Sequence, residues 1–227
     1  MDYKIVINSC EHFEVCLTEC LNSLLKTGFD QYKNIIVVIG NSETPHHPKL
    51  IPISEITNLK NHNKVIVARI EQNNFEFNSI IALYKYRNNN LFKSKYFFYT
   101  NDTTQFLVDF TQKIDLIPRD YDIVTGKNPF ANIMFISKKY INLVKNIFDG
   151  KISKQEAIGI EFGSERKFPK LKSFGKFLEY GSRFQEGKKN SHKIYGSLRT
   201  KYVYSEYGIV KYCKMFSIKT KDEFLKP

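Results

Sequence analysis

The chain has 227 residues, 42% of them hydrophobic, and its 35 Lys and Arg against 23 Asp and Glu give a formal charge of +12. This composition excludes a disordered chain, and no apolar run approaches the roughly 18 residues of a membrane-spanning helix. The positive charge favours anionic partners, such as nucleic acids, phosphorylated cofactors and acidic membranes, without choosing among them.

The first forty residues predict a strand, a helix and a second strand. Tyr3 to Asn8 is a short β-branched run of the kind that forms buried strands. Apolar residues from Phe13 to Leu25 recur at helical spacing, and Gly28 is placed to end that helix. Ile35 to Ile39 is a continuous apolar strand. This order is typical of the start of a parallel sheet.

The next part of the chain continues the α/β pattern. Residues 44–63 are rich in Pro, Asn and His and predict a loop with one short helix. A third strand is expected over 64–70, a helix over 79–90 and an aromatic strand over 96–99. A helix is predicted from Thr104 to Ile114, with Phe106, Val108, Phe110 and Ile114 facing inward.

The remaining elements are two strands and a helix, followed by a weakly periodic segment. "YDIVTG" and "ANIMFIS" read as strands, and "KKYINLVKNIF" reads as a helix. Near the C-terminus, "KYVYSEY" and "IVKYCKMF" resemble strands. We expect one domain, in which residues 1–126 form the ligand-binding half and 127–227 the remainder.

Polar residues follow each of the first four expected strands, at the points where the strands end. Ligands of open parallel sheets bind at this edge, because the loops converge there. The residues concerned are Asn8, Ser9, Cys10 and Glu11, then Gly40, Asn41, Ser42 and Glu43, then Glu71, Gln72, Asn73 and Asn74, then Thr100, Asn101, Asp102 and Thr103. Each Asn or Ser alone is typical of a turn or helix cap. Four polar ends together favour a binding site.

Asp102 is the only carboxylate at the end of the aromatic strand. One or two carboxylates and the phosphate oxygens of a substrate suffice to bind Mg²⁺ or Mn²⁺. Asp102 is therefore predicted to hold a divalent metal against a nucleotide's phosphates. Asp120 and Asp122 form a second Asp-x-Asp, which is interpreted as a solvated turn.

Four segments resemble the nucleotide-sugar-binding half of GT-A fold glycosyltransferases, the Rossmann-like sugar transferases of the family 2 kind. They are "IVINSCEHFEVCLTECLNSLL", "NIIVVIGNSE", the segment from Asn73 to Asn78, and "KYFFYTNDT". The resemblance covers roughly residues 3–148. It implies a mostly parallel mixed sheet flanked by helices, with a C-terminal extension closing the cleft.

The resemblance also implies roles for individual residues. Asn8 and Ser9 would lie near the nucleobase and Asn41 near the uracil or its equivalent. Asn73 and Asn78 would contact the ribose and the sugar-bearing side, and Asn132 would lie near the sugar. Thr100, Asn101 and Asp102 stand where the family has Asp-x-Asp, so the first acidic residue is missing. This departure predicts a weaker or more phosphate-dependent metal site.

A transferase of this kind that inverts the anomeric centre needs a carboxylate base for the acceptor hydroxyl. Glu161 and Glu165 are the candidates, since the resemblance places the base in this region. The departing diphosphate needs positive charge, which Lys193 and Arg199 would supply, with His192 as a second metal ligand.

The prediction is a metal-assisted, inverting glycosyltransferase that moves a sugar from a UDP-sugar or GDP-sugar to a glycan or glycoprotein. One alternative is a basic nucleic-acid-binding module, although no motif of such modules is present. Another Rossmann-like transferase is disfavoured because the first loop contains no glycine. A third alternative is a catalytically silent relative, which binds the nucleotide sugar without turning it over.

The four cysteines form no CxxC pair, and no histidine lies at zinc-finger spacing from them, so a structural zinc site is not predicted. Cys16 and Cys20 are interpreted as small core residues of the first helix. The first residues lack the pattern of a secretory signal. We therefore expect a reducing, cytoplasmic location, and the abundance of Lys, Asn and Ile suits a bacterial, phage or viral origin.

Overall fold

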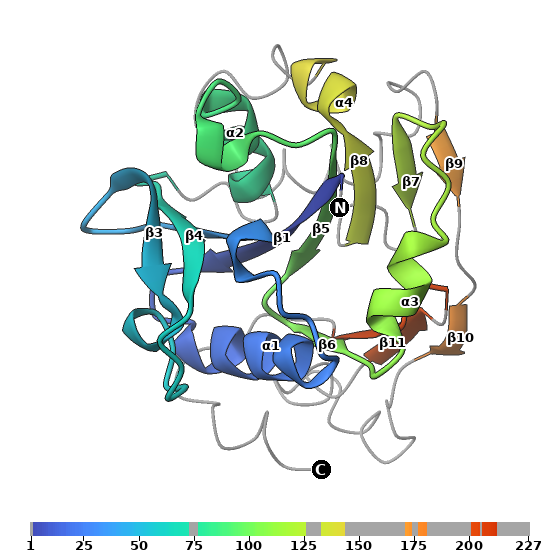
Figure 1. Cartoon of the computed structure of the whole chain (residues 1–227), viewed down its shortest axis with the longest axis horizontal. Helices are drawn as coiled ribbons and strands as arrows, with labels where there is room; N and C mark the ends of the chain where they lie inside the picture. The colour runs from blue at the N-terminus through green and yellow to red at the C-terminus, as the bar shows by residue number, and fades with distance from the viewer. Residues whose placement is uncertain are drawn as a thin grey trace, which may run out of the picture.

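The computed structural model describes residues 2–72, 77–125, 133–143, 171–173, 177–180, 201–204 and 206–212. Within these residues the chain forms an α/β fold with two sheets (Figure 1). No helix of the described part has both the length and the hydrophobicity that crossing a bilayer requires.

The larger sheet has eight strands in the order β3-β4-β2-β1-β5-β8-β7-β9. Their bounds are β1 (Tyr3–Cys10), β2 (Ile35–Gly40), β3 (His46–Pro52), β4 (Lys64–Arg69), β5 (Tyr96–Asn101), β7 (Ile123–Thr125), β8 (Ile133–Ser137) and β9 (Leu171–Ser173). Strands β4, β2, β1 and β5 are parallel to one another, whereas β3 and β8 run antiparallel to their neighbours β4 and β5. The predicted mixed, mostly parallel sheet is confirmed.

Helices cover both faces of this sheet: α1 (Glu14–Lys26) and α3 (Phe110–Asp115) pack on one face, and α2 (Asn78–Lys85) and α4 (Lys138–Leu143) on the other (Figure 1). Alternate residues of β1 point to opposite faces, so Ile5 and Ile7 join one core and Val6 joins the other. Strands buried on both faces are therefore apolar throughout, which is why the sequence revealed them.

Helix α1 forms as predicted because its apolar residues recur every three or four positions. Its buried residues include Cys16 and Cys20, which confirms their interpretation as core residues. The helix ends before Gly28, whose φ of +80° lies in the left-handed region that glycine adopts at little cost.

The smaller sheet has the order β10-β11-β12-β6 and joins the C-terminal part of the chain to the N-terminal half. Its strands are β6 (Thr104–Phe106), β10 (Phe177–Tyr180), β11 (Lys201–Tyr204) and β12 (Ile209–Tyr212). The two C-terminal strands expected from the sequence are confirmed. Strand β12 pairs antiparallel with β6, which opposes Lys211 to Thr104.

The predicted helix from Thr104 to Ile114 is wrong in its first half. Residues Thr104–Phe106 form β6, and α3 begins only at Phe110. Val108, which was expected to face inward, is 80% exposed, whereas Phe106, Phe110 and Ile114 are buried. The three-residue strand forms because its backbone groups pair with β12, more than 100 residues away.

The loop predicted over 44–63 contains an unexpected strand. Residues His46–Pro52 form β3, which pairs antiparallel with β4 at the edge of the sheet and has a register shift between His46 and Lys49. Prolines are tolerated on an edge strand because one side of it needs no hydrogen-bond donors. The short helix is a 3-10 turn, Ile53–Glu55, and two further 3-10 turns span Tyr32–Asn34 and Asn90–Phe92.

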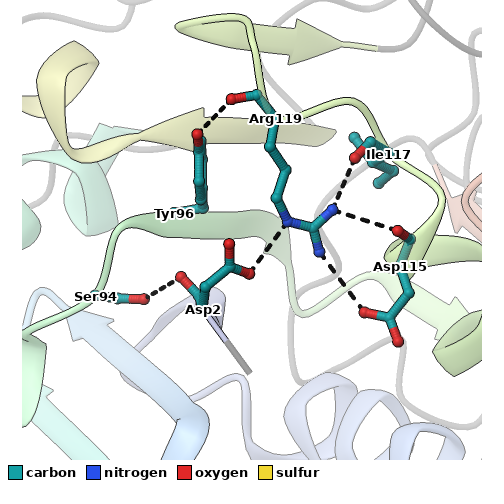
Figure 2. A network of polar contacts seen from close by, with 6 residues as sticks. All are labelled: Asp2, Ser94, Tyr96, Asp115, Ile117 and Arg119. Carbon is teal, nitrogen blue, oxygen red and sulfur yellow. Dashed lines mark hydrogen bonds and ion pairs between the residues drawn. The ribbon is translucent and has the colours of Figure 1, made fainter.

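Arg119 ties the start of the chain to the segment between α3 and β7 (Figure 2). Its guanidinium lies 3.1 Å from Asp2 and 3.6 Å from Asp115. It also donates to the carbonyl oxygen of Ile117 at 2.8 Å, and its own carbonyl accepts a bond from the Tyr96 hydroxyl. These contacts fix the amino-terminal edge of the large sheet.

Candidate active site

The polar ends of the parallel strands lie at one edge of the large sheet. In the β1–β5 pair Asn8 is opposite Asn101, and in the β1–β2 pair Cys10 is opposite Gly40. The backbone amide of Asp102 donates to the carbonyl of Asn8 at 2.9 Å. Residues predicted from separate strand ends are thus neighbours in space.

Asp102 is buried at this edge and is held by Ser9. The Ser9 hydroxyl donates to Oδ2 of Asp102 at 2.7 Å, and Asp102 itself is only 7% exposed. Burial raises the pKa of Asp102 from 3.8 to about 6, although the hydrogen bond from Ser9 and the charge of Lys211 partly oppose the increase. The carboxylate is therefore oriented, and its charge is poorly compensated by solvent.

Lys211 is the charged neighbour of this carboxylate that the sequence did not reveal. It lies on β12, is 3% exposed, and donates a hydrogen bond from Nζ to the hydroxyl of Thr103. Its charge lowers the pKa of Asp102. The strand pairing that brings it here joins residues more than 100 positions apart, so no local pattern could have predicted it.

Asn8 and Asn78 hold the start of α2 against the strand ends. Oδ1 of Asn8 accepts from the backbone amide of Ser79 at 2.9 Å and from its hydroxyl at 3.0 Å. Asn78 is fully buried and packs over Gly40, where a Cβ would lie 2.1 Å from Nδ2 of Asn78. Both asparagines thus have structural roles, and their predicted contacts with a nucleotide stay predictions.

Thr100 and Asn101 are also enclosed by their own neighbours. The Thr100 hydroxyl lies 2.6 Å from that of Thr104, and Oδ1 of Asn101 accepts from the Tyr99 hydroxyl at 3.0 Å. Asn41, by contrast, is exposed in a left-handed turn with φ of +55°. Its backbone amide donates to the carbonyl oxygen of Gln72. Asn41 is therefore the predicted nucleobase contact with the greatest access to solvent.

A second charged pair lies at the same edge, between the residue after β1 and the last residue of β4. One guanidinium nitrogen of Arg69 lies 2.8 Å from both carboxylate oxygens of Glu11. Partial burial raises the pKa of Glu11, but hydrogen bonds from Ser42 and Arg69 and the charge of Arg69 outweigh it, so the pKa is lowered. Arg69 was missed because it follows an apolar strand without any motif.

The other predicted site residues fall outside the described part of the chain. They are the candidate bases Glu161 and Glu165, the amides Asn73 and Asn132, and the residues expected near the diphosphate, His192, Lys193 and Arg199. Their roles stay predictions.

The described residues at Asp102 do not complete a divalent-metal centre on their own. No group of three or more His, Cys, Asp or Glu in the described ranges could hold a metal ion. One oxygen of Asp102 already accepts from Ser9, and the nearby charged group is the Lys211 ammonium, which repels a cation. A metal here would need ligands such as His192, from outside the described ranges.

The opposite edge of the sheet carries a basic hollow of about 640 Å³. Five lysines line it: Lys4, Lys93, Lys95, Lys138 and Lys139. Asp122 lies at this edge and is buried, with its carboxylate 3.8 Å from Lys139, so its prediction as part of a solvated turn is wrong.

Comparisons with known proteins found similar solved structures, whereas no protein-family model and no curated protein sequence matches the chain. The glycosyltransferase GlyE of Streptococcus pneumoniae TIGR4 is 12% identical, with a TM-score of 0.45, over 99% of this chain and 61% of GlyE. The inositol-1-phosphate CTP transferase from T. maritima is 9% identical, with a TM-score of 0.42, over 77% and 86% of the two chains. S. aureus TarS is 13% identical, with a TM-score of 0.43, over 75% of this chain and 58% of that one.

The chain thus spans about three fifths of GlyE and of the TarS structure. Similarities at this level concern the fold alone. The residues gathered at the carboxyl edge of the sheet carry the functional argument below.

Proposed function

We propose that the chain is a glycosyltransferase that binds a nucleotide sugar at the carboxyl edge of its large sheet. The observation that carries the proposal is the meeting of Ser9 and Asp102 through a 2.7 Å hydrogen bond, at the edge where Asn8 opposes Asn101. A buried carboxylate with a raised pKa at this edge lowers stability, which is typical of a functional site.

In this proposal the nucleoside part of the donor lies along the ends of β1, β2 and β4. Exposed Asn41 would contact the base, and the diphosphate would lie beside residues 101–103. The Glu11–Arg69 pair lies between the ends of β1 and β4 and limits how the nucleoside can enter. These contacts orient the donor so that its anomeric carbon faces the acceptor.

The transfer breaks the bond between the anomeric carbon and the diphosphate oxygen and forms one to the acceptor oxygen. The acceptor proton would pass to Glu161 or Glu165. A carboxylate base of this kind favours inversion, because an inverting displacement deprotonates the acceptor on the face opposite the leaving group. A glycan or glycoprotein is the proposed acceptor, and a UDP-sugar or GDP-sugar the proposed donor.

Mn²⁺ or Mg²⁺ at Asp102 and His192 stays a prediction from the sequence. A bound divalent ion would neutralise the departing diphosphate. Because the described donor set does not complete a site for such an ion on its own, no step of the proposal depends on it.

The direct test is hydrolysis of a panel of UDP-sugars and GDP-sugars by the purified protein, with EDTA or with added Mn²⁺. Slow release of free sugar is expected from an active transferase without its acceptor. Binding of UDP or GDP without any release, in both conditions and with candidate glycans added, would instead indicate a catalytically silent relative. Absence of binding as well would contradict the proposal.

The five-lysine hollow at the opposite edge favours one second candidate, binding of nucleic acid. That function predicts an affinity for RNA or DNA that falls steeply with salt concentration. It also predicts that the double substitution Lys93→Glu and Lys95→Glu abolishes the affinity. Nucleic-acid binding that persists in this double variant would show that the hollow is not the binding site.

A further inference from the structure

Lys211 places a positive charge beside Asp102, the buried carboxylate of the candidate site. Its Nζ donates to the hydroxyl of Thr103, the residue that follows Asp102, and Lys211 is opposite Thr104 in the β6–β12 pair. The backbone register therefore fixes the position of the ammonium relative to residues 102–104. Long, flexible lysine side chains on a protein surface have no such restriction.

Lys211 is a buried charge on an apolar stretch of its strand. Lys211 is 3% exposed, and its neighbours on the same strand, Ile209 and Val210, are buried apolar residues. Removing an ammonium from water is unfavourable by several kcal/mol unless partners compensate it, and an apolar residue of similar size often gives a more stable protein. Such a departure from an apolar strand is expected where a charge serves a ligand.

The charges at this site balance without a metal. Two carboxylates and one divalent cation sum to zero, and so do one carboxylate and one ammonium. Here Thr100 is neutral at the first position of the Thr-Asn-Asp segment, and among the described residues Lys211 is the cation whose charge acts on the buried acid Asp102. One carboxylate with a buried lysine beside it therefore needs no divalent ion for charge balance.

We propose that the Lys211 ammonium, and not a divalent metal ion, is the cation that contacts the diphosphate of the bound nucleotide. This inference rests on the proposed function, because it concerns the same site. The Thr103 hydroxyl accepts a hydrogen bond from the ammonium and keeps it near residues 101–103. A diphosphate that enters accepts a charge-assisted hydrogen bond from Nζ. An ammonium is a strongly hydrated point charge and a common phosphate ligand.

The experiment measures binding of UDP, GDP, uridine and guanosine to the full chain by titration calorimetry, first in EDTA and then in Mn²⁺. Lys211→Met removes the charge and keeps an unbranched side chain, and Lys211→Arg keeps the charge. Lys64→Met is the matched control, because it removes one positive charge from an exposed residue at the start of β4. Thermal unfolding of each variant checks that it folds.

The wild type is expected to bind a diphosphate in EDTA, with less than a twofold gain from Mn²⁺. Lys211→Met should weaken diphosphate binding by about tenfold or more, which corresponds to one lost charge-assisted hydrogen bond, and leave nucleoside binding unchanged. Lys211→Arg should lose less diphosphate affinity than Lys211→Met, and Lys64→Met should bind the diphosphate as tightly as the wild type. Mn²⁺ should partly restore binding to Lys211→Met, because the repelling ammonium is gone.

A wild type that binds the diphosphate only with Mn²⁺ overturns the inference and leaves the proposed function intact, and this result needs no variant. Equal loss of uridine and UDP affinity in Lys211→Met would also overturn it, since that pattern indicates a structural role. Failure of the wild type to bind any of the four compounds would overturn both the inference and the proposed function.

Discussion

The hydroxyl of Ser9 donates a 2.7 Å hydrogen bond to Oδ2 of Asp102 across the β1–β5 boundary, although 93 residues separate the two in sequence. This bond fixes the orientation of the buried acid and joins the two strand ends on which the proposed donor site depends. It stabilises the ionised carboxylate more than the neutral one, because an anionic acceptor forms the stronger bond.

Replacing Ser9 with Ala should raise the pKa of Asp102 further above its value of about 6, because the hydrogen bond that opposes the effect of burial is lost. Titration of the Asp102 carboxyl carbon by NMR measures this change. Ser94→Ala is the control, since the Ser94 hydroxyl donates to the backbone oxygen of Asp2 at the opposite edge. An unchanged midpoint in Ser9→Ala would show that the bond does not form in solution.

Replacing Asp102 with Asn should stabilise the protein at neutral pH. The pKa of Asp102 is raised from 3.8 to about 6 by burial, so the folded state binds more protons than the unfolded state between these values, and stability falls as pH rises through them. At about 1.4 kcal/mol per pH unit, the cost above pH 6 reaches about 3 kcal/mol.

Urea unfolding of the wild type and Asp102→Asn at several pH values measures this effect. The variant should be more stable by up to about 3 kcal/mol at pH 7.5, and the difference should become small near pH 3.5, where the carboxyl group is mostly protonated in both states. A variant that is less stable at pH 7.5 would mean that the Lys211 ammonium needs the ionised acid for folding.

Replacing Gly40 with Ala should destabilise the junction between β2 and α2. The added Cβ would lie 2.1 Å from Nδ2 and 2.7 Å from Cγ of the fully buried Asn78, so that side chain must move. Overpacking of this kind typically costs about 1–3 kcal/mol. Urea unfolding measures the cost.

The double variant Gly40→Ala with Asn78→Ala provides the control for this contact. Removing the side chain that clashes should make the glycine substitution almost neutral, so the two changes should be strongly non-additive. Additive losses would show that Gly40 is needed for another reason than its contact with Asn78.

Replacing Arg119 with Ala should cost about 1–2 kcal/mol, and most of the loss should persist in 1 M salt. Its ion-pair partners Asp2 and Asp115 are largely solvent-exposed, so the pairs are screened. The hydrogen bond to the Ile117 carbonyl (Figure 2) is not screened by salt in this way. The same holds for the packing of the guanidinium over Phe135, 5.1 Å from the ring centre.

Urea unfolding with and without the salt separates these contributions. Lys113→Ala removes the exposed pair between Lys113 and Asp109 and should cost less than about 0.5 kcal/mol. A loss in Arg119→Ala that disappears in salt would assign the stabilisation to the ion pairs instead.

The central strands could be predicted because the burial of a strand on both faces leaves a pattern within a few consecutive residues. Ile35–Gly40 and Tyr96–Asn101 are buried on both faces, so they appear as unbroken apolar runs followed by polar residues. The gathering of those polar residues at one edge followed from the parallel order of the strands. Burial of Cys16 and Cys20 followed from helical spacing in the same way.

The errors have a common physical cause, which is pairing between distant segments. Thr104–Phe106 and His46–Pro52 become strands because β12 and β4 supply partners for their backbone groups. The same pairing brings Lys211 beside residues 102–104, and it therefore hid the cation of the proposed site from sequence analysis. The contact of Asn8 with the first turn of α2 was missed for a similar reason, since propensity alone does not identify the helix that an asparagine caps.

The central claim is that a nucleotide's diphosphate binds beside Asp102 at the carboxyl edge of the large sheet. A crystal structure of the protein grown with UDP or GDP tests it most directly. The account predicts density for the diphosphate within hydrogen-bonding distance of residues 101–103, with the base along the ends of β1 and β2. A nucleotide bound only in the lysine-lined hollow at the opposite edge would contradict it.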